Sequence, residues 1–234
     1  ALHGPRYTGE TTASKLKRVR AAMKEMGAKV HVLAALDNIA WLFNIRSKDI
    51  RFTPVVISYA VVTERGATLF VDKRKIKPSI RKSLAKNVKI ADYGDLPEAL
   101  KTLAKKRLPV LVDPVTTNRW VVGLLQGAEL VEATSPCTPF KAVKNATQLK
   151  GFAAAHVRDG VAMVKFLKWL EGAVPEGGVT EISAAEALTA FRAEDRMFKD
   201  CSFGTISGYA DHGAIVHYEA DAESDAKLKS RGLY

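Results

Sequence analysis

The residues whose types could do chemistry gather near the end of the chain. Residues 202–207 read SFGTIS and residues 213–218 read GAIVHY, with a Gly/Ala/Asp/His/Gly turn between them. The two short apolar runs predict a strand pair, and a rigid pair of strands can present one titratable side chain, His217, to a pocket. The simpler interpretations are a core histidine at His217 and an exposed turn residue at His212.

The other metal-binding and acid–base residues form no recognisable motif. None of the five histidines and two cysteines belongs to a C-x-x-C or H-E-x-x-H pattern, so no metal site is predicted within this chain. The carboxylates Glu181, Asp195 and Asp200 lack the spacing of a catalytic pair, and solvated charges at helix ends explain them better. Cys137 and Cys201 are too far apart to indicate a disulfide framework, which favours a reducing cytoplasmic location.

A further polar segment surrounds Trp41 and Arg46. Asp37 is predicted to cap a short helix whose apolar side chains face a core. The loop at residues 46–49 could approach an active site of the same or a neighbouring subunit, but packing is the simpler account.

Alternating short apolar runs and helical patterns predict a mixed α/β domain over residues 1–141. Gly27, Gly66 and Asp113-Pro114 separate the elements. Strands are expected at residues 29–35, 54–63, 67–72, 88–93 and 109–113, and helices at 14–26, 78–86, 96–106 and 116–126.

A second region is predicted over residues 142–234. The two prolines in residues 135–139 predict an extended connector, after which Asn145 and Gln148 have the spacing of a helix cap and its reciprocal partner. The long helix that follows should end at Gly172 and Pro175. Its apolar residues recur every three or four positions and predict one buried face: Phe152, Ala155, Val161, Val164, Leu167 and Leu170. Thr180 should cap a second helix to about residue 194.

Composition is that of an ordinary globular protein, with 47% hydrophobic and 26% charged residues. No apolar run approaches the ~18 residues that span a bilayer, so no membrane segment is predicted. The net charge is +11, and the excess lies in residues 1–141, with 25 Lys/Arg against 12 Asp/Glu. Because these cations are scattered over separate elements without interleaved aromatic residues, a solvated basic face is favoured over a nucleic-acid surface.

Four segments, in one order, resemble the Xaa-Pro aminopeptidases (aminopeptidase P) of the pita-bread metallopeptidase class. They are LDNIAWLFNIR at 36–46, KAVKN at 141–145, VPEGGVTEISAA at 174–185 and the 202–218 segment. The resemblance runs from about Tyr7 to Tyr234. It implies a creatinase-type N-terminal domain, a mixed sheet that resembles ribonuclease H, followed by an incomplete α+β pita-bread domain.

The resemblance also implies two divalent metal ions, usually manganese, held on two Asp, one His and two Glu. All of those family positions follow a position like Tyr234, so the chain is expected to be a fragment of a larger enzyme, inactive alone, with an exposed apolar helix face. The family histidine matching His217 lines the substrate pocket and hydrogen-bonds the bound peptide. Asp211 and His212 depart from the usual family turn, so His212 is at most a second polar contact at the pocket rim, and Tyr218 is expected to serve packing.

The function implied for the parent protein is release of an N-terminal residue from peptides with proline in second position. Family resemblance also suggests a homodimer. Two alternatives remain open from the sequence. A prolidase would use the same chemistry on dipeptides only, whereas a non-catalytic binding module, as in the large subunit of the histone chaperone FACT, would lack the metal ligands altogether.

Overall fold

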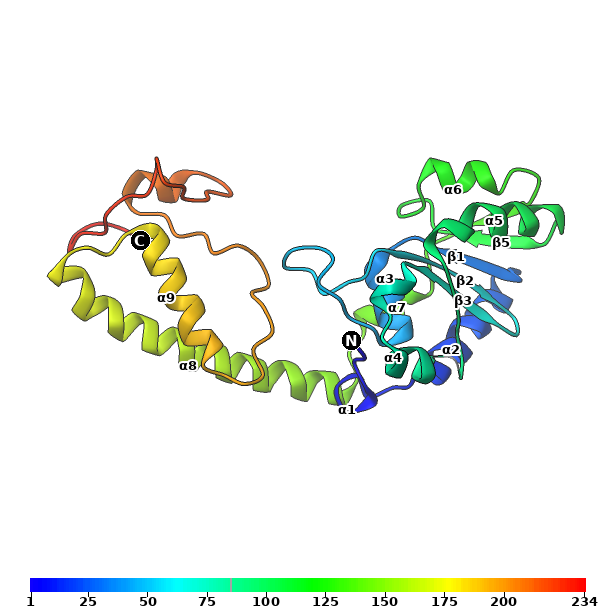
Figure 1. Ribbon diagram of the computed structural model, residues 1–234, viewed down its shortest axis with the longest axis horizontal. Helices are drawn as coiled ribbons and strands as arrows, with labels where there is room; N and C mark the ends of the chain where they lie inside the picture. Colours follow the sequence, from blue (N-terminus) through cyan, green and yellow to red (C-terminus); the bar gives the residue numbers. More distant parts are fainter. Residues whose placement is uncertain (85) are drawn as a thin grey trace. The chain divides into compact units, whose positions relative to one another are not determined.

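The computed structural model describes residues 1–84 and 86–234. The chain forms two compact units, Ala1–Leu149 and Lys150–Tyr234, and each is described by itself (Figure 1). The sequence predicts a domain boundary between residues 141 and 142, and that boundary stays a prediction. Among the described residues, none of the helices combines the length and the apolar character of a membrane-spanning segment.

A six-stranded mixed sheet forms the centre of the first unit, in the order β4-β3-β2-β1-β5-β6. Strands β1–β2 and β2–β3 pair antiparallel, and β1–β5, β3–β4 and β5–β6 pair parallel. The strands are β1 Val30–Leu33, β2 Ser58–Thr63, β3 Ala67–Val71, β4 Lys89–Ala91, β5 Pro109–Val112 and β6 Glu129–Glu132.

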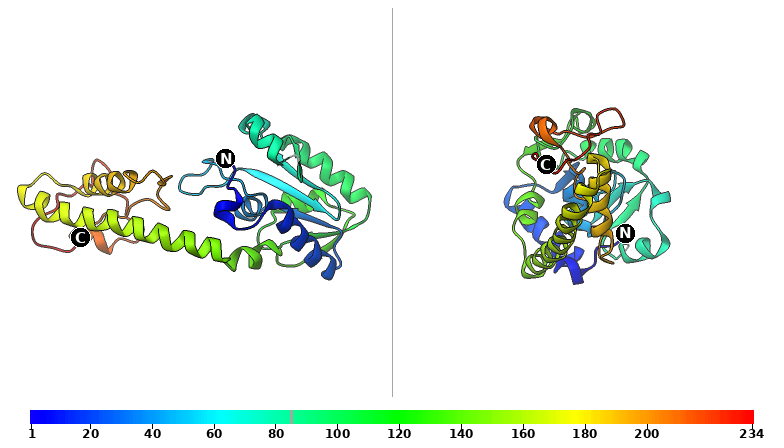
Figure 2. Two further views of the ribbon diagram at one scale, coloured as in Figure 1. Left: turned by 90° about the horizontal axis from the view of Figure 1, so that it is seen from below. Right: turned by 90° about the vertical axis from the view of Figure 1, so that its left-hand side faces the viewer.

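Helices cover both faces of this sheet (Figures 1 and 2). On one face, Leu16, Phe43 and Leu69 belong to a core with the side chains of α2, α3, α4 and α7. On the other face, Val32 and Leu100 belong to a second core with α5 and α6. The helices of this unit are α1 Pro5–Thr8, α2 Thr12–Glu25, α3 Leu36–Phe43, α4 Pro78–Leu84, α5 Leu96–Lys105, α6 Arg119–Leu124 and α7 Cys137–Ala142, with short 3-10 turns at Lys73–Lys75 and Tyr93–Asp95.

Each strand and helix predicted within residues 14–126 is present, with shifted ends, so the expected mixed α/β fold is confirmed. Residue 85 of the helix predicted at 78–86 lies outside the described residues. The extended connector predicted at residues 135–139 is wrong. Helix α7 begins at Cys137 and contains Pro139. Pro139 lies in the first turn, where a helix has no intrahelical partner for its N–H, so proline is tolerated there. Strand β6 carries no strong alternation and was not predicted.

The predicted cap at Asn145 is present and also reaches the N-terminal residues. Asn145 and Gln148 exchange side chain–backbone hydrogen bonds of 3.0 Å each. The Asn145 Nδ2 donates to the carbonyl of Thr8 at 2.8 Å. The next residue, Gly9, has φ +67°, and a Cβ there would lie 2.6 Å from Asn145 Oδ1. Only glycine fits this close approach without displacing the cap.

Helix α8, Ala146–Glu176, and helix α9, Glu181–Ala193, supply the helices of the second unit. A small core contains Phe166, Val179, Ala184, Leu188 and Leu228. The prediction that Gly172 and Pro175 end α8 is wrong, because the helix continues to Glu176 with Pro175 in its last turn. The left-handed residues Gly177 and Gly178, with φ +86° and +88°, end it instead.

The apolar face of α8 is largely exposed among the described residues, as expected for residues 142–234 without the rest of their sheet. Phe152, Val161, Val164 and Leu167 are each more than half exposed, whereas Ala162 and Phe166 are buried. The second unit offers only α9 and one long irregular segment to cover a helix of 31 residues. One flank of α8 therefore faces no partner within the described second unit.

Candidate functional site

The candidate site is built around the first turn of α9. Two consecutive left-handed glycines reverse the chain after α8, and Thr180 then caps the new helix. The Thr180 hydroxyl accepts from the Ser183 N–H at 3.2 Å, and the Thr180 N–H donates to the Ser183 hydroxyl at 2.8 Å. This reciprocal cap, with the N-cap predicted from the sequence, fixes Glu181 as the first residue of the helix.

Glu181 is fully buried, and four groups of the C-terminal segment lie within hydrogen-bond distance of its carboxylate. Oε1 accepts from the Tyr209 N–H at 2.6 Å, and Oε2 accepts from the Tyr218 hydroxyl at 2.8 Å and the Ala226 N–H at 3.1 Å. The His212 Nδ1 lies 3.0 and 3.1 Å from the two oxygens. One carboxylate thus joins α9 to three separate parts of the C-terminal segment.

The electrostatics of Glu181 follow from these bonds. Burial acts to raise its pKa, but the donors from Tyr209, Ala226, Tyr218 and His212 outweigh burial and lower the pKa below its usual value. The interpretation of Glu181 as a solvated helix-end charge is therefore wrong. The carboxylate is a buried, ionised anchor whose lone pairs are satisfied by fixed donors.

Further bonds attach the C-terminal segment at the same end of α9. The Ser207 hydroxyl donates to the carbonyl of Glu181 at 2.6 Å, and the Asp225 carboxylate accepts from the Ile182 N–H at 2.9 Å. The Leu228 N–H donates to the carbonyl of Val179 at 2.9 Å. The start of α9 is therefore the point at which residues 207–228 are held.

The strand pair predicted in the 202–218 segment is not formed. Residues Ala210–Ala214 make a 3-10 turn, and the flanking apolar runs are irregular. A strand needs a neighbouring backbone for its N–H and C=O groups. Within the described part of the second unit, the isolated bridge Thr180–Lys227 is the sole β-pairing.

His212 and Tyr218 are held on the anchor. The His212 ring packs against the Tyr218 ring at a centroid distance of 4.7 Å, and both side chains reach the Glu181 carboxylate. His212 is thus half-buried and paired, which differs from the exposed turn residue of the simpler interpretation. Tyr218 is buried, as expected for a packing residue.

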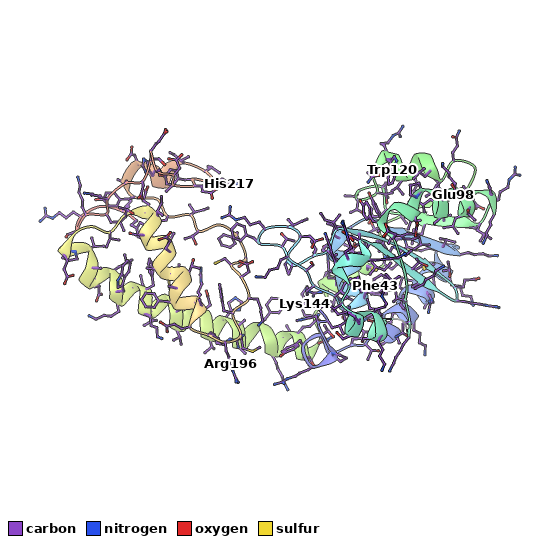
Figure 3. All side chains as sticks on the ribbon, viewed as in Figure 1. Phe43, Glu98, Trp120, Lys144, Arg196 and His217 are labelled. Carbon is purple, nitrogen blue, oxygen red and sulfur yellow. The ribbon has the colours of Figure 1, made fainter. Side chains whose placement is uncertain are left out.

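His217 lies directly before the anchored Tyr218, and its ring is exposed (Figure 3). Its backbone has φ +59°, in the left-handed region that residues other than glycine rarely adopt. No hydrogen bond to its ring is found among the residues the structure describes. Both ring nitrogens are therefore available to a ligand, while the Tyr218–Glu181 bond fixes the neighbouring backbone.

The polar segment around Arg46 is packed within the first unit. The Arg46 Nη1 donates to the carbonyls of Ala40 at 2.9 Å and Ile45 at 2.8 Å. Asp49 pairs with Lys75 at 2.5 Å. The prediction that Asp37 caps a helix is wrong, because α3 begins after Ala35 without a side-chain cap. Asp37 instead forms an ion pair with Lys141.

The described residues do not fit a metal centre. No group of three or more His, Cys, Asp or Glu side chains among them could hold a metal ion. The Glu181 carboxylate accepts from the Tyr209 and Ala226 N–H groups and from the Tyr218 hydroxyl, and these donors occupy the lone pairs that a cation would need. Cys137 and Cys201 are both free.

Glu181 is the residue that sequence reasoning missed. Its hydrogen-bond partners lie between 28 and 45 residues further along the chain. No local spacing can reveal such a contact, although the Val-Thr-Glu sequence after two glycines correctly marks a helix start.

Comparisons with known proteins agree over both units. The sequence profile of the creatinase/prolidase N-terminal domain matches residues 1–148, and that of metallopeptidase family M24 matches residues 150–234. Xaa-Pro aminopeptidase 1 of Dictyostelium discoideum is 36% identical over 233 residues, covering 98% of this chain. This chain spans only 37% of that relative's length.

Solved structures give the same result. An X-prolyl aminopeptidase from Caenorhabditis elegans, described as a cytosolic enzyme with a di-nuclear active site, has a TM-score of 0.94 and 29% identity, covering 99% of this chain and 39% of its own. An Xaa-Pro dipeptidase from Bacillus anthracis, with a TM-score of 0.69 and 16% identity over 94% of this chain and 58% of its own, shares the fold. The chain therefore belongs to the creatinase/prolidase N-terminal domain family and, with its M24 region, resembles the Xaa-Pro aminopeptidases over its whole length.

Proposed function

We propose that this chain is part of an Xaa-Pro aminopeptidase, which releases the N-terminal residue from peptides with proline in second position. The observation that carries the proposal is the likeness of both units, in order and over 98% of the chain, to an Xaa-Pro aminopeptidase at 36% identity. The relatives are longer, so the activity is proposed for the longer protein and not for these 234 residues alone.

His217 is proposed as the substrate contact that this chain contributes. Its ring is exposed and carries no hydrogen bond within the described residues. The next residue, Tyr218, is bonded to the buried Glu181 carboxylate. A positioned imidazole N–H can donate to a peptide carbonyl and so fix the register of the substrate or stabilise charge on its oxygen. His212 is the weaker candidate, because its Nδ1 already faces the Glu181 carboxylate and leaves only Nε2 for a substrate.

Substrate choice follows from the chemistry of proline. An Xaa-Pro bond is a tertiary amide, so the proline nitrogen offers no N–H to a peptidase that grips the backbone. We propose that the longer protein uses two divalent cations, manganese by family resemblance, together with residues outside this chain. A homodimer and a cytoplasmic location complete the proposal; the cytosolic Caenorhabditis elegans relative supports the location.

The experiment is hydrolysis of Arg-Pro-Pro by the full-length protein with added manganese, with the 234-residue chain assayed in parallel. Activity is expected from the full-length protein and none from the isolated chain. Replacing His217 by alanine should lower kcat/KM by about 100-fold or more, the size seen for loss of a positioned donor. The matched control, His156→Ala, removes an exposed histidine on α8 and should leave kcat/KM within about twofold.

Different outcomes separate the alternatives. Cleavage of Xaa-Pro dipeptides without cleavage of Arg-Pro-Pro would mean a prolidase. A folded full-length protein that cleaves neither substrate under any metal would favour a binding module. If the His217→Ala and His156→Ala variants had equal effects on kcat/KM, His217 would not be a substrate contact. The proposal of an aminopeptidase activity would be unaffected.

A further inference from the structure

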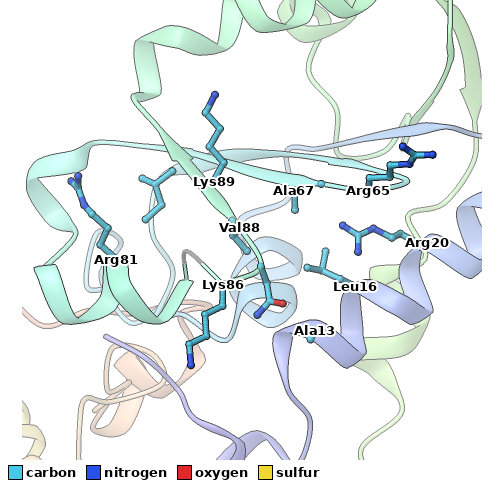
Figure 4. A pocket seen from close by; sticks show the side chains of 12 residues that line it. Ala13, Leu16, Arg20, Arg65, Ala67, Arg81, Lys86, Val88 and Lys89 are labelled. Carbon is cyan, nitrogen blue, oxygen red and sulfur yellow. The ribbon is translucent and has the colours of Figure 1, made fainter.

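A basic hollow on the first unit belongs to none of the features described so far. It has a volume of about 660 Å³ and lies between α2, the turn joining β2 to β3, helix α4 and the residues leading into β4 (Figure 4). Its lining includes five cationic side chains and no acidic one: Arg20, Arg65, Arg81, Lys86 and Lys89.

The cations come from four parts of the fold, and Arg81 is the one on α4. Arg20 projects from α2, one turn after the buried Leu16 that contributes to the lining. Arg65 lies in the tight turn between β2 and β3, and Lys89 begins β4, which pairs with β3. Because the sheet and α2 share one core, the position of the hollow is set by the fold and not by a mobile tail.

Arg20 is the most constrained of the five. It is half-buried, and its Nε donates to the carbonyl of Thr63 at 2.9 Å. Burial lowers the pKa of Arg20 from its usual value, and no carboxylate counteracts this shift. In the described residues, none of the five cations forms an ion pair with a carboxylate, and Glu64, beside Arg65, does not line the hollow.

Figure 4 shows cationic side chains on opposite sides of the hollow. Arg20 and Arg65 lie on one side of the hollow and Arg81 and Lys86 on the other, and the charged ends of Arg81, Lys86 and Lys89 fan outwards. Like charges without a counter-ion repel one another. An anion carrying several charges would offset that repulsion and could be reached by long, flexible side chains from both sides.

We propose that this hollow binds a compact polyphosphate anion. Guanidinium groups present paired N–H donors that match phosphate oxygens, and lysines add point charges. A volume of about 660 Å³ is in the range of small-molecule sites, whereas a single phosphate would leave most of it empty. No aromatic residue lines the hollow, so it lacks the stacking surface typical of single-stranded nucleic-acid sites.

The chain supplies its own matched control. A second basic hollow of about 560 Å³ lies between α5 and α6 and is lined by Lys101, Lys105 and Arg107. The double variant Arg65→Gln/Lys89→Gln removes two exposed cations from the proposed site. Lys101→Gln/Lys105→Gln removes two exposed cations from the second hollow, so both variants change the net charge equally.

The test is isothermal titration of the 234-residue chain with inorganic tripolyphosphate, at low and at physiological salt, with thermal melts to check that each variant folds. Saturable binding of one tripolyphosphate is expected. The Arg65/Lys89 variant should bind on the order of tenfold more weakly or worse, since hydrogen bonds to charged groups are lost, while the Lys101/Lys105 variant should stay within about twofold.

Three results would overturn the proposal. They are the absence of saturable binding, an equal loss of affinity in both double variants, and tighter binding of a DNA or RNA duplex that displaces tripolyphosphate. The second result would mean attraction to net charge alone, and the third would assign the basic face to nucleic acid. None of these results depends on the aminopeptidase activity of the longer protein.

Discussion

The two units bury a charged side chain in opposite ways. In the first unit, Lys15 is 1% exposed, and its ammonium donates to the Trp41 carbonyl at 2.9 Å and to Asn44 Oδ1 at 2.7 Å. Its Nζ also lies 4.4 Å from the centre of the Trp41 ring. No carboxylate pairs with it among the described residues. Burial, the largest cause, lowers the pKa of Lys15 to about 8.

In the second unit, Glu181 is 0% exposed, but backbone, hydroxyl and imidazole donors fill its lone pairs, and its pKa falls in the direction that keeps it charged. A buried charge is costly when its surroundings favour the neutral form and stabilising when they favour the charged form. The first unit tolerates Lys15 because two extensive cores surround the sheet. The second unit has a much smaller core and depends on Glu181 to hold its irregular segment.

The largest expected effect is therefore at Glu181. Replacing it by glutamine removes the charge and leaves the Tyr209 and Ala226 N–H groups and the Tyr218 hydroxyl with a weaker acceptor. We expect a loss of about 3 kcal/mol of local stability in the second unit. Hydrogen exchange measured on peptides covering residues 179–193 and 207–228 should quicken, while peptides of the first unit remain unchanged.

The matched control for Glu181 is Glu186→Gln, an exposed position on the same helix. In this variant, the local free energy of opening measured by hydrogen exchange should stay within about 0.5 kcal/mol of that of the original protein. Equal protection in the two variants would mean that the buried carboxylate does not hold the segment, and the contrast between the units would fail.

Acid should act on the same contact. The folded pKa of Glu181 is lowered, so its stabilising contribution is present above the unfolded value near 4.5 and is lost as pH falls through the folded pKa. Protection of residues 207–228 should decrease below about pH 4.5. The Glu181→Gln variant should lack this added acid sensitivity, and an identical pH profile in both proteins would contradict the assignment.

Raising the pH above 8 should increase the stability of the first unit. Lys15 has a folded pKa of about 8 against an ordinary value of 10.5, so between these pH values the unfolded chain binds more protons and stability rises with pH. Across this window, the free energy of unfolding of the original protein should rise by up to about 3 kcal/mol relative to that of Lys15→Met. Urea unfolding followed by tryptophan fluorescence in a Trp169→Phe background would report on the first unit.

The control for Lys15 is the exposed neighbour Lys17. A Lys17→Met reference should give the same pH dependence as the original protein. A flat difference between the original protein and Lys15→Met from pH 8 to 10.5 would show that Lys15 is not held as a buried cation.

A smaller effect is expected from Tyr218→Phe. The change keeps the ring that packs on His212 and removes the 2.8 Å bond to Glu181. A loss of about 1.5 kcal/mol of protection in residues 207–228 is expected, because the lost bond is to a charged acceptor. If protection of residues 207–228 did not change, the backbone N–H groups of Tyr209 and Ala226 would be the donors that hold the segment.

The smallest effect is expected at the Asp37–Lys141 pair of the first unit. Asp37 is 57% exposed on its side chain and Lys141 29%, so solvent screens the pair. Asp37→Asn should change the free energy of unfolding by about 0.5 kcal/mol or less. A loss near 3 kcal/mol would show that surface and buried charges contribute alike in this protein.

Much of the first unit could be predicted from sequence because its signals are local. Strand and helix patterns, and the Asn145–Gln148 cap, follow from spacings of two to four residues. Where a prediction was wrong, the exact position within an element decided the outcome. Pro139 is tolerated because it falls in the first turn of α7, whereas Pro175 lies near the end of α8, where only Glu176 follows it in the helix.

The second unit was predicted less well because its structure depends on distant contacts. The apolar runs beside His217 have strand character but no neighbouring strand in the described chain. Glu181 looked like a surface charge because its donors come from residues 209, 212, 218 and 226. The roles of His212 and His217 as substrate contacts stay predictions until the full-length protein is assayed.

The contact between Asn145 and the Thr8–Gly9 turn has a consequence for synthesis on the ribosome. Thr8 is translated well before its partner, because the side chain that donates to it comes 137 residues later. Until then, the Thr8 carbonyl lacks this donor. Closure of the first unit therefore awaits translation of residue 145, and a nascent chain released before that point should remain frayed around the Thr8–Gly9 turn.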